Sequence, residues 1–310
     1  MRLCTVETEK TAPFFGIELK KKVLRVHEAA RAFALPETEL AYFHSLHTYL
    51  EGLPKSEKAL RALLKEISAT PKTLGKPAPD GEPYLIDQST VKYLPPIQRP
   101  GKFLCIGMNY RDHCEEQNKE IPKKPVVFNK FATSLIGHET PIPLPLRYDK
   151  SVDYEAELGV VIGKRARRVT KRTAMKHVAG YIIVNDVSLR AIQRSENQWS
   201  RAKGFDGSGP CGPCIVTADE IPDPHRLRIS CTLNGKTVQS SNTENLIFKV
   251  GDLISFISQV MTLEPGDIIS TGTPGGVGAF RNPPRFLAPG DVIEVRIDRL
   301  GSLKNRCEKG

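Results

Sequence analysis

The chain is poor in several features that mark particular classes of protein. It has one tryptophan and four methionines, and none of its apolar runs approaches the ~20 residues that a membrane-spanning helix needs. Its seven cysteines are an odd number, so a disulfide framework would leave one unpaired. The first residues contain no secretory apolar region, and Glu7 and Glu9 argue against a transit peptide. These absences predict a cytoplasmic protein with reduced thiols and no membrane partner.

The remaining composition is that of a globular protein. Hydrophobic residues make up 39% and charged residues 26%, which excludes a disordered or collagen-like chain. Lysine and arginine exceed aspartate and glutamate by 45 − 35 = 10. This basic balance admits an anionic partner of several kinds. The densest basic run, 164–172, lacks stacking aromatics, and it favours a solvated loop and no nucleic-acid partner.

A proline-rich stretch divides the 310 residues into two parts. Before it, apolar spacing predicts a helix over 40–50, with Thr38 as its cap, and a second helix that starts at a Ser56 cap. Prolines then recur from Pro71 to Pro100. We therefore predict a small α/β N-terminal domain over 1–97 and a second domain over 98–310.

The second part is rich in short β-branched runs separated by turn residues. Two helices are also predicted, at 173–178 and 250–263. Asn234-Gly235 predicts a two-residue hairpin turn. The fold class is therefore α+β, mainly β and largely antiparallel. The predicted strands are 126–128, 158–162, 181–184, 227–233, 267–270 and 291–297.

The stretch from Val152 to Val161 carries the clearest chemical signal. Side chains alternate along a strand, so Asp153, Glu155 and Glu157 are predicted to share one face. Adjacent carboxylates repel one another, and a bound cation removes that cost. All-oxygen ligands favour Mg²⁺, Mn²⁺ or Ca²⁺. The alternative is an amphipathic strand with a wet acidic face.

Asp186 is a third candidate ligand. It ends the apolar run 180–184, where an unpaired carboxylate would cost several kcal/mol. A divalent ion shared with Glu155 and Glu157 would satisfy it. The alternative is a turn or helix-capping aspartate.

Five segments, in the same order along the chain, resemble the fumarylacetoacetate hydrolase family, and within it the branch of fumarylacetoacetate hydrolase domain-containing proteins. The segments are Gly107 to His113, Asp153 to Leu158, Asn185 to Ser188, Arg201 to Asp206 and Thr271 to Gly278.

The resemblance implies a mixed β-sandwich roll, a homodimer, and one Mg²⁺ or Mn²⁺ per active site, with Ca²⁺ as a possible substitute. It carries the role of metal ligand onto Glu155, Glu157 and Asp186. It does not cover residues 1–97 beyond the idea of a variable N-terminal domain.

His113 and Glu116 stand three residues apart, so on a helical turn they share a face. A carboxylate beside an imidazole orients it for proton transfer. Most such pairs are surface pairs, and Glu115 competes by spacing. The resemblance implies that this pair is the family's catalytic dyad.

Cations and hydroxyls for an anionic substrate are also implied by the resemblance. Lys203 would lie at the metal site and stabilise enolate charge, and Arg190 and Gln193 match positions near the metal. Thr271 or Thr273, in a glycine-rich loop that lacks the ending of a phosphate loop, would hold a carboxylate. The alternatives are solvated cations and an ordinary tight turn.

The sequence departs from the family pattern near the expected site. Ala191 stands where the family commonly has aspartate, and Gly207-Ser208 replaces the usual Thr-Phe pair. These differences put the substrate in doubt more than the metal.

Cys211 to Cys214 spell C-G-P-C, a redox motif when its first cysteine starts a helix. The strand-like residues 215–217 follow here, so the sequence argues against redox chemistry.

The expected function is a Mg²⁺- or Mn²⁺-dependent hydrolase that cleaves a C–C bond in a small 2-oxo or 1,3-diketo acid. Its small anionic substrate would leave a pyruvate enolate. The alternative at the same site is an oxaloacetate decarboxylase or keto–enol tautomerase. A family member that only binds ligands is the contrasting class.

Overall fold

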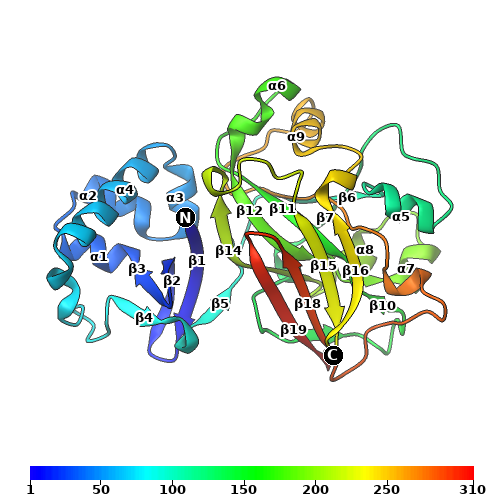
Figure 1. Cartoon of the computed structure of the whole chain (residues 1–310), viewed down its shortest axis with the longest axis horizontal. Coiled ribbons are helices and arrows are strands. Elements are labelled where there is room, and N and C mark those ends of the chain that lie inside the picture. The colour runs from blue at the N-terminus through cyan, green and yellow to red at the C-terminus, as the bar shows by residue number, and fades with distance from the viewer.

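The computed structural model describes all residues, 1–310. The blue and cyan elements form a lobe on the left of Figure 1. Their bounds are β1 (Arg2–Thr8), β2 (Thr11–Leu19), β3 (Lys22–Arg25), α1 (Val26–Ala32), α2 (Glu37–Leu40), α3 (Leu46–Glu51), α4 (Lys55–Ala69), β4 (Leu85–Asp87) and β5 (Lys92–Leu94).

The rest of the chain forms the larger lobe. Its first half contains β6 (Phe103–Gly107), α5 (Arg111–Glu116), β7 (Val126–Lys130), β8 (Leu135–Ile136), β9 (Ile142–Leu144), β10 (Val152–Asp153), β11 (Ala156–Ile162), α6 (Lys171–Ala174) and β12 (Val178–Asn185). Its second half contains β13 (Ser188–Leu189), α7 (Arg190–Ser195), α8 (Ser200–Lys203), β14 (Gly209–Thr217), β15 (Arg228–Leu233), β16 (Lys236–Asn242), α9 (Val250–Ser258), β17 (Ile268–Ser270), β18 (Val292–Ile297) and β19 (Gly301–Lys309).

Twelve strands form one large mixed sheet that runs through both lobes. Its main path is β4-β3-β2-β1-β14-β12-β11-β17-β6-β7. The central strands β11 and β12 are antiparallel and almost wholly buried. A strand buried on both faces reads as a continuous apolar run, which explains the runs at 158–162 and 181–184.

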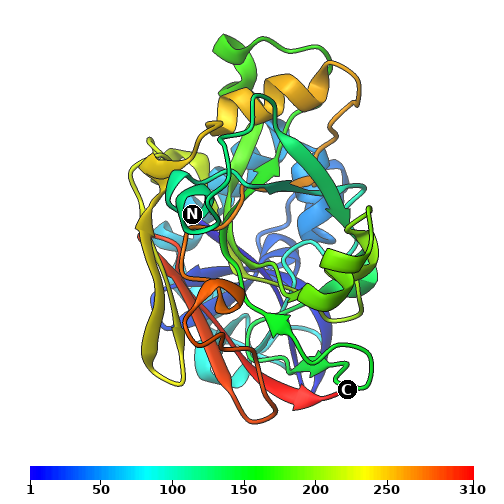
Figure 2. The same ribbon diagram turned by 90° about the vertical axis from the view of Figure 1, so that its right-hand side faces the viewer.

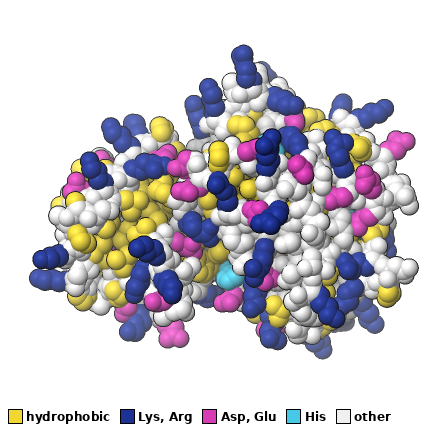
Figure 3. Space-filling view, viewed as in Figure 1, with side chains coloured by type: hydrophobic (Ala, Val, Ile, Leu, Met, Phe, Trp, Pro, Cys, Tyr) yellow, Lys and Arg dark blue, Asp and Glu magenta, His cyan; other side chains and the backbone are white.

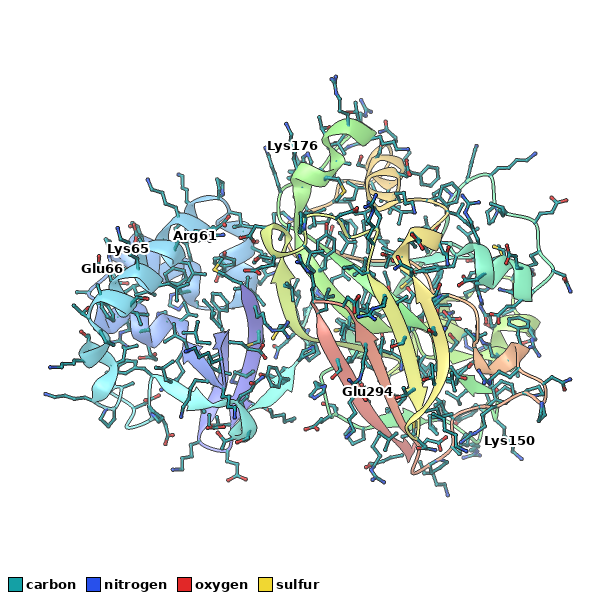
Figure 4. All side chains as sticks on the ribbon, viewed as in Figure 1. Arg61, Lys65, Glu66, Lys150, Lys176 and Glu294 are labelled. Carbon is teal, nitrogen blue, oxygen red and sulfur yellow. The ribbon has the colours of Figure 1, made fainter.

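The N-terminal lobe is joined to the rest through β1, which pairs with β14. Helices α3 and α4 pack on the sheet, and their buried residues Leu50 and Leu60 share a core with Ile182 and Ile215. On α4, the exposed side chains of Lys65 and Glu66 project from the lobe, whereas Arg61 forms an ion pair with Asp219 of the larger lobe at 2.9 Å (Figure 4). The sheet and one core therefore continue across residue 98, and the predicted boundary there stays a prediction.

A second sheet of five strands, in the order β16-β15-β18-β19-β9, covers the large lobe. Figure 2 shows its yellow, orange and red strands as a separate layer. Alternate residues of β15 and β18 point inward and pack with α9 against the large sheet. The predicted α+β, mainly β fold class is confirmed.

The predicted hairpin turn is confirmed, whereas the two predicted N-terminal helices begin at other residues than expected. Asn234 and Gly235 form the predicted hairpin turn between β15 and β16, with φ of 50° and 79°. The helix predicted over 40–50 is interrupted at Ser45, whose hydroxyl caps α3 in place of Thr38. The second helix begins at Lys55, because Ser56 donates its hydroxyl to the Tyr49 carbonyl and does not cap it.

The two helices predicted in the large lobe are both shorter than expected. Helix α6 ends at Ala174, and a 3₁₀ turn carries the chain on to His177. Helix α9 ends at Ser258, whose hydroxyl donates to Ser255 and accepts from the backbone of Val169.

No helix is both long and apolar enough to cross a membrane. Lysine and arginine side chains are spread over the face in Figure 3.

The shared core predicts that the two lobes stabilise each other. Replacing Ile182 by alanine removes a side chain that is 1% exposed and leaves a cavity between the sheet and the N-terminal helices. We expect the free energy of unfolding to fall by about 2–5 kcal/mol in a single cooperative transition. Urea denaturation followed by tryptophan fluorescence and circular dichroism measures this. The exposed Val260→Ala change is the control, and two separate transitions would contradict a shared core.

Candidate active site

The antiparallel pairing of β11 and β12 brings three carboxylates together. Ala156 lies opposite Asn185, so Glu155 and Asp186 flank the same end of the pair. The Asp186 N–H donates to the Glu155 carbonyl at 2.9 Å. One oxygen each from Glu155, Glu157 and Asp186 lie within 4.8 Å of one another, and all three residues are buried.

Asp153 does not join this carboxylate cluster, contrary to the strict alternation expected from the sequence. The strand breaks between β10 and β11, and Tyr154 and Glu155 lie in the break. Asp153 accepts hydrogen bonds from Gly278 and Ala279 N–H groups and from Arg190. The alternative of a wet acidic face is wrong, because Glu155 is only 5% exposed and Glu157 only 1%.

Buried cations compensate most of the negative charge. Lys203 Nζ lies 2.7 Å from Glu155 Oε2 and 2.9 Å from Asp186 Oδ2. Arg190 Nη1 lies 2.7 Å from Glu155 Oε1. Lys130 Nζ lies 2.8 Å from Asp186 Oδ1, although this oxygen accepts no aligned hydrogen bond. Each cation therefore stabilises the charge of a carboxylate, while some acceptor positions on the carboxylate oxygens stay open.

The carboxylates differ in how well their charge is supported. Burial raises the pKa of Glu155, but the charges of Lys203 and Arg190 outweigh burial and hold that pKa at about 2. Burial and the neighbouring charges of Asp186 and Glu155 raise the pKa of Glu157 to about 8. Both hydrogen bonds to Glu157 end on Oε2, which leaves Oε1 without one. Glu157 is thus the carboxylate that most requires a further positive charge.

The glycine-rich loop 271–278 supplies backbone N–H groups to three protein carboxylates. Gly272 donates to Glu157 at 2.9 Å, Gly276 to Glu116 at 2.7 Å, and Gly278 to Asp153 at 2.7 Å. Gly276 has a φ of +99°, and a Cβ there would lie 2.3 Å from the Val238 carbonyl oxygen. The loop therefore positions the site's own acids, a role that the sequence did not predict.

The His113–Glu116 pair forms on helix α5. His113 Nδ1 lies 2.6 Å from Glu116 Oε1, while the other oxygen of Glu116 accepts from Gly276. Glu115 is exposed and makes no such contact. The structure therefore brings together His113 and Glu116, and a neutral imidazole that donates through Nδ1 keeps Nε2 as a proton acceptor.

One cavity of ≈ 240 Å³ joins these groups. His113, Glu155, Glu157, Arg190, Gln193, Lys203 and Thr273 all line it. Thr271 does not line it, and its hydroxyl donates to the Leu158 carbonyl. Thr273 accepts a hydrogen bond from Gln239.

The residues present fit a hard divalent cation. Glu155, Glu157 and Asp186 would hold it, because the cluster offers only oxygen donors. Glu157 Oε1 and Asp186 Oδ1 each retain acceptor capacity without an aligned hydrogen bond. Such an ion would also remove the repulsion that raises the pKa of Glu157.

The sequence did not predict four further residues that shape the site. Lys130, at the end of β7, donates to the Ser208 carbonyl at 2.8 Å and is fully buried. Asp149 accepts from the first N–H groups of α7 and so fixes the helix that carries Arg190. Trp199 lines the cavity and packs edge-on against Phe128. The fourth residue, Gln239, bridges the Ala156 N–H group, the Thr273 hydroxyl and the Pro274 carbonyl.

The departures from the family pattern have local explanations. Ala191 donates its backbone N–H to Asp149, a contact that does not depend on which side chain stands at this position. Ser208 donates its hydroxyl to the Lys203 carbonyl and accepts from Lys130. Cys211 and Cys214 lie inside β14, and burial raises the pKa of Cys211 to about 12. A thiol of this kind is poorly suited to redox exchange.

Comparison with known proteins agrees with this site. The family model described as "Fumarylacetoacetate (FAA) hydrolase C-terminal" matches residues 102–308. The chain is 48% identical over 232 residues to "Oxaloacetate tautomerase fahd2, mitochondrial" of Xenopus laevis, covering 74% of this chain and 72% of that protein. The chain therefore belongs to the fumarylacetoacetate hydrolase family.

Solved structures share the fold along the whole chain. The fumarylacetoacetate hydrolase of Exiguobacterium antarcticum is 30% identical, with a TM-score of 0.78 and full coverage of both chains. The maleylpyruvate hydrolase of Sphingobium sp. SYK-6, solved with manganese(II) and pyruvate, is 25% identical with a TM-score of 0.75 and full coverage of both chains. The protein is thus similar both to proteins named hydrolases and to a protein named a tautomerase.

The raised pKa of Glu157 predicts that metal binding releases a proton. Below pH 8 this carboxyl is largely protonated without metal, and an ion competes with that proton. We expect the Mg²⁺ affinity to rise by up to about tenfold per pH unit between pH 6 and 8, and then to level off. Calorimetric titration in buffers of different ionisation enthalpy counts the released protons. Glu157→Gln should abolish the release, and a pH-independent affinity in the unaltered protein would contradict the assignment.

Proposed function

We propose that this protein is a divalent-metal-dependent enzyme that interconverts the keto and enol forms of a small 2-oxo acid, with oxaloacetate as its substrate. The observation that carries the proposal is one cavity that holds a base and an acid beside the carboxylate cluster. The base is the His113 imidazole, and the acid is the Lys203 ammonium. The tautomerase named for the Xenopus laevis relative supports the same reaction.

The keto-to-enol step requires two proton transfers. In the proposed reaction, His113 Nε2 takes a proton from C3 while Glu116 holds the opposite side of the ring. The electron pair of the broken C–H bond forms the C2–C3 double bond, and the C2 oxygen takes a proton from the Lys203 ammonium, which regains one when the His113 imidazolium releases its proton to solvent. The enol therefore forms without a net change of charge.

Lys203 is suited to the C2 oxygen. Two of its three N–H donors go to Glu155 and Asp186, which leaves one for the substrate. Burial would lower the pKa of Lys203, but the Asp186 and Glu155 carboxylates outweigh burial and raise it. The ammonium is thus charged when the substrate binds, and it stabilises the negative charge that develops on oxygen before it donates its proton.

We infer that Mg²⁺ or Mn²⁺ is the ion, held by Glu155, Glu157 and Asp186. When bound, it would polarise the 2-oxo group and orient the adjacent carboxylate. Arg190 has one nitrogen, Nη2, that is buried without a partner, so it can donate to the same end of the substrate. A homodimer and a cytoplasmic location stay proposals.

A C–C hydrolase is the second candidate. The same His113–Glu116 pair can activate water, and the Sphingobium relative is named a hydrolase. The two reactions differ in whether water reaches a distal carbonyl. Decarboxylation of oxaloacetate would pass through a similar enolate and is a further outcome of the same test.

One NMR experiment separates these reactions. The Mg²⁺-loaded protein is mixed with oxaloacetate and acetylpyruvate in a single tube, beside a Glu155→Ala control that loses a proposed metal ligand. We expect faster keto–enol exchange of oxaloacetate with acetylpyruvate left intact. Acetate and pyruvate formed only by the unaltered protein would establish the hydrolase instead. Wild-type rates in Glu155→Ala would refute the metal site.

The dyad predicts different effects for two neighbouring glutamates. Glu116→Gln keeps the shape but weakens the orientation and basicity of His113, so we expect kcat to fall by about 10²-fold. The matched change Glu115→Gln alters an exposed side chain and should leave kcat unchanged. Steady-state rates with oxaloacetate measure both. Equal losses in the two variants would show that the segment, and not the dyad, matters.

A further inference from the structure

The mouth of the cavity carries two cations that have no acidic partner. Arg194 lies at one wall and Lys119 at another, and both are exposed residues that line the cavity. Neither side chain forms an ion pair or a hydrogen bond within the protein. The acidic residues that line the cavity are Glu155 and Glu157, and the first already binds Lys203 and Arg190.

The helix α7 places Arg194 one turn after Arg190 on the same face. Two like charges four residues apart repel, and this arrangement is slightly unfavourable in a helix. Arg190 is neutralised by Asp153 and Glu155, whereas Arg194 has no such neighbour. The unpaired charge therefore faces the cavity at a small cost that an anion would remove.

Lys119 comes from the segment that follows α5. Its backbone N–H donates to the Cys114 carbonyl at 3.0 Å, which anchors it to the end of the helix that carries His113. Figure 2 shows α5, in teal, and α7, in light green, well apart. An anion that contacts both Lys119 and Arg194 would thus bridge two separate walls of the cavity.

We propose that Lys119 and Arg194 recognise a second carboxylate of the substrate, the one remote from the 2-oxo group. This inference rests on the proposed function, because it assumes a 2-oxo acid whose first carboxylate lies at the carboxylate cluster. It assigns to these two residues the recognition of the second carboxylate that oxaloacetate carries. Arg194 and Lys119 are specificity-determining residues, and they take no part in the proton transfers.

The geometry also predicts how the two ends of the substrate divide their contacts. The deep end meets Lys203 and the buried Arg190, and the outer end meets the two mouth cations. Charge-assisted hydrogen bonds to a carboxylate are stronger than neutral ones, but exposed cations are screened by salt. Loss of a mouth cation should therefore weaken substrate binding more than it slows the chemistry.

The test compares oxaloacetate with 2-oxobutanoate, which has the same carbon skeleton but no second carboxylate. Exchange of C3 protons in D₂O is followed by NMR for the Mg²⁺-loaded full chain and for Arg194→Met, Lys119→Met and the double variant. We expect KM for oxaloacetate to rise by about tenfold in each single variant and further in the double variant. kcat and the kinetics of 2-oxobutanoate should stay near wild-type values.

Matched controls are available elsewhere on the surface. Lys123→Met and Arg172→Met each remove an exposed cation that does not line the cavity. Their KM values should match the unaltered protein. The proposal is overturned if the double variant keeps the wild-type KM for oxaloacetate, or if KM rises equally for both substrates.

A binding measurement separates failure of this inference from failure of the proposed function. If the unaltered protein turns over neither acid, the Mg²⁺-loaded protein is titrated with each acid while its thermal unfolding is followed. Stronger stabilisation by oxaloacetate than by 2-oxobutanoate, lost in the double variant, would support the dicarboxylate site alone. Equal stabilisation by the two acids would overturn it.

Discussion

The structure of this site depends on placing three carboxylates within 4.8 Å of one another away from water. Such a cluster is unstable unless positive charge and hydrogen-bond donors surround it. Lys203, Arg190 and Lys130 supply charge, and Gly272 supplies a backbone N–H to Glu157. The compensation is incomplete at Glu157, and this is why the cluster suits a divalent ion and not a set of permanent ion pairs.

The loop 271–278 connects this cluster to the acid–base machinery. Its N–H groups reach Glu157, Glu116 and Asp153, so a single segment fixes one carboxylate of the cluster, the partner of His113 and the partner of Arg190. Backbone donors are rigid and lose little entropy when they bind a carboxylate. The relative position of the His113–Glu116 pair and the carboxylate cluster is therefore set by the main chain, and not by flexible side chains.

Local spacing was enough to predict part of this arrangement. Glu155 and Glu157 stand two residues apart at the start of β11, and His113 and Glu116 stand one helical turn apart, so short-range geometry identified them. The break at Tyr154 moved Asp153 away from the cluster, and no residue pattern marked that break. Lys130 and the loop N–H groups arrive from distant strands, and β1 joins β14 across most of the sequence. Long-range pairings of this kind leave no periodic signal in the chain.

The deep end of the cavity is lined by buried charges and its mouth by exposed ones. This difference explains how the sequence departs from its family without losing the site. At the deep end the charges are buried and, except for Glu157, form ion pairs, so the loss of one partner leaves an uncompensated charge. At Ala191 the contact comes from a backbone N–H, which tolerates other side chains, and at Ser208 it comes from a small hydroxyl. At the mouth, exposed cations on α7 and after α5 can change without cost to the carboxylate cluster. The chemistry is thus fixed by the buried wall, while the choice of substrate is left to the exposed one.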